Sequence, residues 1–187
     1  SGEAAEIYAA YHRIFDCCSH GWSNVQAMHL NLPFSGDGEF ARLHAAVRLV
    51  TPLVPAIAAS SPFMDGIAAT SLDARVDCCA TNAASLPSIA GRMIPEPVAT
   101  REAYERDILG PMYREIAPLD PAGVLQREWL NSRAAIARFD RSAIEMRAFD
   151  VQECPCADVA IAVATAAAVR RCYEAGHDAL EAQQRMH

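Results

Sequence analysis

The sequence predicts an α+β fold in which an antiparallel β-sheet with a polar concave face is backed by helices. Residues 25–32 and residues 143–149 each alternate apolar and polar side chains, which is the period of a strand with one buried face. Between them, apolar residues recur at the three-and-four spacing of a buried helical stripe: Phe40, Leu43, Val47, Val50, Val54 and Ile57. We therefore expect at least two strands and a long core helix.

The other segments fit one compact unit, because the 187 residues contain no internal repeat, low-complexity tract or linker. The stripe helix contains Pro52 and Pro55, which should kink it or end its regular hydrogen bonding. Residues 68–97 lack clear periodicity and are expected to be irregular, with a short strand or helix inside. The remaining expectations are helices at 4–15, 100–109 and 158–176, a helical piece after 176, a loop at 60–66 and turns at 33–38 and 120–123.

Composition limits the classes of partner. The formal net charge is −7 and all 16 basic residues other than histidine are Arg, so a uniform basic face for nucleic acid is not expected. No stretch reaches the roughly 18 uncharged apolar residues of a membrane span. No secretory signal is visible at the first residues, and we expect a cytoplasmic protein that does not bind membranes.

Seven cysteines, an odd number, are present without CxxC spacing. Reduced thiols are the favoured interpretation, in keeping with a cytoplasmic location. A zinc site formed by Cys17, Cys18 and His20 is a weaker alternative, because it lacks a second ligand pair at a recognised spacing.

The polar faces of the two strands carry the candidate chemistry. The first presents His29 and the second presents Glu145 and Arg147. Each strand face also has an ordinary structural explanation. His29 could be a hydrogen-bonded histidine at a sheet edge, and Glu145 and Arg147 could belong to a cross-strand salt-bridge network. Together, on adjacent antiparallel strands, His29 and Glu145 could ligate a hard divalent cation, while guanidinium groups hold phosphate oxygens. Such a site would suit phosphoryl transfer.

Arginines also gather ahead of the second strand. Charge runs usually form a solvated face, but here they alternate with apolar residues, so some must approach the core and meet anions there. The arginines concerned are Arg127, Arg133, Arg138, Arg141 and, in the strand itself, Arg147.

Three ordered blocks resemble the glutamate–cysteine ligase type 2 family, whose members have a glutamine synthetase-like catalytic fold. They are Gln26-Ala-Met-His-Leu-Asn-Leu-Pro-Phe34, then Pro55-Ala-Ile-Ala-Ala-Ser-Ser-Pro-Phe-Met-Asp-Gly66, and Ala143-Ile-Glu-Met-Arg-Ala-Phe-Asp150. The resemblance extends from about residue 24 to residue 161. It implies an ATP-dependent ligase that joins the γ-carboxylate of glutamate to an amine, cysteine or a related one, through an acyl phosphate. A cysteine acceptor would place it in glutathione biosynthesis.

The resemblance also implies residue roles. His29 and Glu145 would bind an active-site Mg²⁺, and Arg147 would read the glutamate carboxylate or the phosphate. Arg75 stands where the family has an arginine after its Ser-Ser-Pro-Phe loop, and is implied to hold substrate or phosphate. The phosphate-side cations would be Arg138 and Arg141, and Asn31 would contact the nucleotide.

Two departures from the family qualify these expectations. Asn31 replaces the second histidine of a His-x-His pair and is a weaker metal ligand. The Glu-x-Glu-type strand of the family's N-terminal half is missing. We therefore expect residues 1–187 to be the C-terminal half of a larger catalytic domain. The chain would either lack the N-terminal half or form a homo-oligomer. A non-catalytic binding or assembly module derived from the same fold is the alternative.

Overall fold

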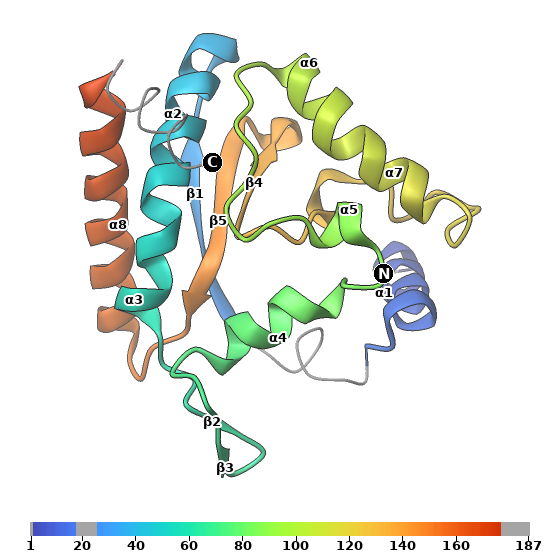
Figure 1. Cartoon of the computed structure of the whole chain (residues 1–187), viewed down its shortest axis with the longest axis horizontal. Helices are drawn as coiled ribbons and strands as arrows, with labels where there is room; N and C mark the ends of the chain where they lie inside the picture. The colour runs from blue at the N-terminus through green and yellow to red at the C-terminus, as the bar shows by residue number, and fades with distance from the viewer. Residues whose placement is uncertain (1, 18–25, 177–187) are drawn as a thin grey trace.

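The computed structural model describes residues 2–17 and 26–176, and its centre is an antiparallel sheet (Figure 1). The strand order is β1 (Ala27–Pro33), β5 (Ala143–Asp150), β4 (Ala135–Arg138), and both pairings are antiparallel. A separate two-residue hairpin, β2 (Phe63–Met64) with β3 (Ile67–Ala68), projects from the body. The predicted α+β class, with an antiparallel sheet backed by helices, is confirmed.

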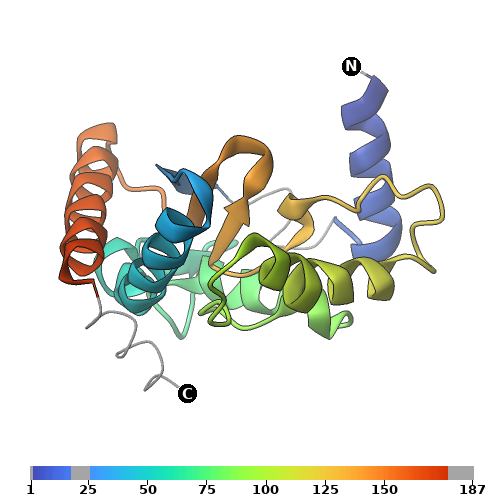
Figure 2. The ribbon, with the colours of Figure 1, turned by 90° about the horizontal axis from the view of Figure 1, so that it is seen from above.

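One face of the sheet packs on helices. Helix α2 (Gly36–Val50) continues through a 3₁₀ turn, η1 (Thr51–Leu53), into α3 (Val54–Ala58), and α8 (Pro155–Ala175) packs against α2. A second helix lies across the same face of the sheet. It consists of α6 (Arg101–Tyr104), a π-helical turn η2 (Glu105–Leu109) and α7 (Gly110–Ile116). Figure 2 shows α2 and the helix that runs from α6 to α7 on one side of the strands, with α8 at the left beside them.

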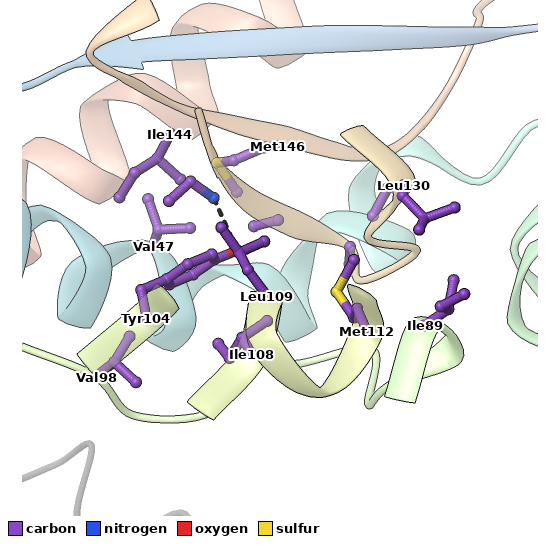
Figure 3. Close-up of a cluster of buried hydrophobic side chains, with 14 of the residues drawn as sticks. Val47, Ile89, Val98, Tyr104, Ile108, Leu109, Met112, Leu130, Ile144 and Met146 are labelled. Atoms are coloured by element: carbon purple, nitrogen blue, oxygen red, sulfur yellow. Dashed lines mark hydrogen bonds between the residues drawn. The ribbon is translucent and has the colours of Figure 1, made fainter. Parts of the chain in front are cut away.

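The core lies between the sheet and these helices (Figure 3). Ile144 and Met146 of β5 point towards Val47 of α2 and towards Tyr104 and Met112 of the second helix, and all five side chains are buried. Burial of such side chains is the main favourable term in folding. The apolar face predicted for residues 143–149 is confirmed.

The predicted proline kink occurs where the sequence places it. Pro52 lies in η1 and Pro55 is the second residue of α3, so the two regular helices are joined by a tighter turn. The kink changes the phase of the apolar stripe. Five of its six predicted members are buried, but Ile57 is 49 % exposed and Ala58 occupies the buried position instead.

Residues 68–97 contain two short helices, α4 (Ala74–Asn82) and α5 (Pro87–Ala90). The chain after them is held by buried side chains rather than by repeated backbone bonds. Arg48 donates from Nε to the Pro95 carbonyl, and Arg133 donates to the Glu96 carboxylate. This explains why the segment has no periodicity in the sequence.

The other described elements are α1 (Gly2–Phe15), η3 (Glu128–Leu130) and η4 (Phe139–Arg141). Helix α8 begins three residues before the predicted start at Asp158, with Cys154 at its N-cap. The turn at 120–123 is confirmed by a bond from the Gly123 amide to the Asp120 carbonyl. The helical piece predicted after residue 176 lies outside the described residues.

A side chain, Tyr104, and the loop that contains Met93 cover the outer edge of β4. The Tyr104 hydroxyl accepts the Ala137 amide at 3.1 Å, and the Met93 carbonyl accepts the Ala134 amide at 3.1 Å. Along β1, the described residues contribute no strand to the outer edge. A strand edge without a partner strand can pair with another strand.

His44 gives the fold a specific acid sensitivity. Its ring is buried in α2 beside Phe40 and Tyr104, and neither ring nitrogen has a hydrogen-bond partner within residues 2–17 and 26–176. Burial together with the nearby Arg48 charge lowers its pKa to about 3. Because the folded pKa lies below the unfolded value, the unfolded chain binds more protons between pH 6.5 and 3. Stability should therefore fall as pH decreases through this window, by about 1.4 kcal/mol per pH unit.

We expect His44→Phe to remove that slope, since it keeps an aromatic ring and deletes the titrating group. The measurement is urea unfolding at several pH values between 6.5 and 4.5, above the range in which carboxylates dominate. His12→Gln, at a largely exposed position in α1, is the control and should keep the wild-type slope. An unchanged slope in His44→Phe would assign the acid sensitivity to other groups.

Candidate functional site

His29 and Glu145 lie on neighbouring antiparallel strands with their side chains in contact. The His29 Nδ1 is 3.4 Å from the Glu145 Oε1. The register passes from Met28–Phe149 to Leu30–Met146, so a bulge in β5 lies opposite His29. Bulges commonly re-aim a side chain next to a functional site. The predicted placement of this pair on adjacent antiparallel strands is confirmed.

Glu145 is at the centre of a cationic cluster and is only 4 % exposed. Arg147 donates from Nε to Glu145 Oε1 at 2.6 Å, and Arg138 donates from Nη1 to Glu145 Oε2 at 3.2 Å. The hydrogen bond from His29 lowers the pKa of Glu145 to about 2, with Arg147 adding to it and burial opposing it. The carboxylate is therefore ionised throughout the physiological pH range.

A cavity of about 430 Å³ opens beside this cluster. Its charged and titratable lining groups come from four distant segments and are His29, Arg75, Cys79, Arg133 and Arg147. Among the described residues, the lining contains no Asp or Glu. The carboxylates that pair with these arginines, Asp150, Glu96 and Glu145, are not part of the cavity lining. A cavity of this size with guanidinium groups on its wall suits a small anionic ligand.

Arg147 is fixed by the backbone as well as by Glu145. Its Nη1 donates to the Asn131 carbonyl at 2.8 Å and to the Trp129 carbonyl at 3.4 Å. These contacts hold the planar guanidinium in one orientation at the cavity wall. Such preorganisation favours forked recognition of a carboxylate or phosphate.

Arg133 is a site residue to which the sequence reasoning assigned no role. It is 5 % exposed and forms a two-pronged pair with Glu96, at 2.6 Å and 2.7 Å. Burial acts to raise the pKa of Glu96, but the Arg133 hydrogen bonds and charge outweigh it, so that pKa is lowered. Gly91, at φ +57°, makes room for the guanidinium, because a Cβ there would lie 2.3 Å from Arg133 Cζ. The only sequence signal was the mixing of arginines with apolar residues.

Arg75 links two of the sequence blocks described above. It is 7 % exposed, and its Nε donates to Asp150 Oδ1 at 2.5 Å. The other oxygen, Asp150 Oδ2, accepts the Ser60 amide at 2.8 Å and the Ser61 hydroxyl at 2.7 Å. The Ser-Ser segment and the last residue of β5 thus position Arg75 at the cavity.

The structure brings together some of the predicted residues and separates others. His29, Arg75 and Arg147 line the cavity. Arg138 is buried on the far side of Glu145, where it also pairs with Asp140 at 2.9 Å. Asn31 lies opposite Glu145 in the register but outside the cavity. Arg141 is exposed and lies 3.9 Å from Asp140, so it does not join the cluster.

His29 and Glu145 offer one imidazole nitrogen and one carboxylate to a cation. The described part of the chain contains no group of three or more His, Cys, Asp or Glu residues suited to hold a metal. This pair fits Mg²⁺, which takes few protein ligands and keeps water and phosphate in its shell, but it forms only part of a site. Of the zinc alternative, Cys18 and His20 lie outside the described residues.

Comparison with known proteins gives one family and one relative. The family model described as glutamate–cysteine ligase family 2 matches residues 3–187. A protein of Archaeoglobus fulgidus, described only as uncharacterized, is 39 % identical over 155 residues. The match covers 83 % of this chain and 42 % of that protein, so the chain spans less than half the length of this relative. No solved structure matches the chain.

Proposed function

This chain belongs to the glutamate–cysteine ligase family 2, and we propose that it forms part of the active site of an ATP-dependent carboxylate–amine ligase. The substrates would be ATP, glutamate and an amine such as cysteine. The γ-carboxylate would be activated as an acyl phosphate, and the amine would then displace phosphate to form the amide.

The observation that carries this proposal is the convergence of Arg75, Arg133 and Arg147 on one cavity, whose wall has no acidic residue in the described part of the chain. Both glutamate and the transferred phosphoryl group are anions with planar or near-planar sets of oxygens. Guanidinium groups match these oxygens two at a time. The cavity is also large enough for a small metabolite.

The chain's own residues would act by positioning and by electrostatics. Arg147, held by Glu145 and by the Asn131 carbonyl, would present two donors to an incoming carboxylate or phosphate. Arg133 and Arg75 would add positive charge where the phosphoryl group transfers, at fixed positions set by Glu96 and Asp150. In phosphoryl transfer, positioning and charge stabilisation supply most of the catalysis.

His29 and Glu145 would hold Mg²⁺ with help from residues beyond those the structure describes. When bound, the ion would neutralise phosphate charge. Arg147 contacts the same carboxylate, so Glu145 would position this arginine as well as hold the ion.

The test is phosphate release by the complete protein with ATP, Mg²⁺, glutamate and a panel of amines, with mass spectrometry of the product. We expect release that depends on both glutamate and one amine, and a product whose mass is the sum of the two less water. ATP binding without glutamate-dependent release, or no nucleotide binding at all, would instead support the non-catalytic module.

A further inference from the structure

Two adjacent cysteines of α4 face surroundings of opposite charge. Cys79 lines the cavity with Arg75, Arg133 and Arg147. Cys78 lines a separate hollow, together with Asp65 and Asp77. Both thiols are free and partly buried. Because the two residues are neighbours in the chain, differences between them report on the surroundings alone.

Cys79 is tied directly to a cationic group. Arg75 Nη1 lies 3.9 Å from the Cys79 Sγ, one helical turn away. The second terminal nitrogen of this buried guanidinium, Nη2, has no hydrogen-bond partner among the residues that the structure describes. A buried donor without a partner is costly, and an anionic group entering the cavity would be attracted to it.

We propose that Cys79 is a covalent modification site for small disulfides that carry carboxylates, and that the resulting mixed disulfide occupies the cavity. The arginines would bind the carboxylate of the reagent and so place its sulfurs next to Cys79. Cavity volume sets the size limit, since about 430 Å³ admits one small organic anion beside the thiol. Modification would thereby block the site to other anions.

The step is a thiol–disulfide exchange. The Cys79 thiol loses its proton to water, the thiolate attacks one sulfur of the reagent, and the other sulfur leaves as a thiolate. One S–S bond breaks and one forms, so no further oxidant is needed. The leaving thiolate carries a carboxylate and is stabilised by the same arginines as it departs.

Cys79 should react slowly at neutral pH and faster in mild base. Burial raises the pKa of its thiol, and Arg75 offsets this only in part. Below that pKa the thiolate fraction grows about tenfold per pH unit, and the thiolate is the nucleophile. Other charged groups near the thiol are Asp73 in the same loop–helix segment and Arg133 and Arg147 across the cavity.

The experiment compares three disulfides of similar size with different charge: dithiodiglycolate (anionic), bis(hydroxyethyl) disulfide (neutral) and cystamine (cationic). Modification rates of the folded protein are measured by mass spectrometry in Cys78→Ser, which keeps Cys79, and in Cys79→Ser, which keeps Cys78. The ratio of the Cys79 rate to the Cys78 rate cancels the intrinsic reactivity of each reagent. Added salt tests whether charge sets the preference.

We expect this ratio to be at least about tenfold larger for dithiodiglycolate than for cystamine at low salt, and to shrink in high salt. Inorganic phosphate should protect Cys79 and leave Cys78 unaffected. Equal ratios for the three reagents, or no modification of Cys79 in the folded protein, would overturn the proposal. The readout needs no ATP, glutamate or Mg²⁺, so its outcome is independent of the ligase reaction.

Discussion

Glu145→Gln should lower the free energy of unfolding by about 3 kcal/mol at neutral pH, because it removes the carboxylate that pairs with buried Arg138 and with Arg147. The pKa of Glu145 is lowered to about 2, below its ordinary value of 4.5. Its stabilisation is therefore complete above pH 4.5 and lost as pH falls towards 2. The variant should lack this part of the acid transition.

Denaturant unfolding of both proteins between pH 7 and pH 2 measures the effect. The two stability curves should converge at the acidic end, where Glu145 is protonated in the wild type. The matched control is Glu174→Gln, which removes an exposed carboxylate that pairs with Arg170 and should leave stability unchanged within error. If the stability curves of Glu145→Gln and wild type run parallel across this pH range, Glu145 does not contribute to the acid transition.

Under the ligase reaction proposed above, Arg147→Lys should lower glutamate-dependent turnover of the complete protein by at least about tenfold, which corresponds to roughly 1.4 kcal/mol of transition-state stabilisation. Lysine keeps the positive charge but not the planar fork that now bonds Glu145 and the Asn131 carbonyl at the same time. A lysine ammonium cannot make both contacts and also present two donors to the cavity.

Steady-state kinetics with varied glutamate and ATP would show which substrate Arg147 serves. Arg170→Lys, at an exposed position on α8, is the control and should keep wild-type kinetics. Wild-type kinetics in Arg147→Lys, with unchanged stability, would assign Arg147 to the structural network around Glu145 alone.

The sequence by itself determined the strands that carry the site and the pairing of their polar faces. Alternation alone places His29 on one face of its strand and Glu145 with Arg147 on one face of theirs, because successive strand residues point to opposite sides. The three blocks identified the family, and the family model confirmed it. The proline kink could likewise be predicted, since proline lacks the amide proton that a regular helix requires.

Only the tertiary structure decided which arginines share a cavity. Arg133 and Arg147 are brought there by adjacent strands and loops, while Arg75 comes from a helix far away in the sequence, and no periodicity encodes that meeting. Arg141 looks much like Arg138 in the sequence. Yet it is exposed in the turn after β4, whereas Arg138 is buried against Glu145.

The burial of Glu145 also depended on long-range contacts. The sequence offered a polar strand face open to water, but Arg138, Arg147 and His29 enclose the carboxylate and compensate its loss of hydration. The position of Cys79 followed in the same way, because the orientation of α4 turns one of two adjacent thiols towards the arginines and the other towards aspartates. Local pattern fixes which face of an element a residue occupies, and packing between distant segments fixes what that face meets.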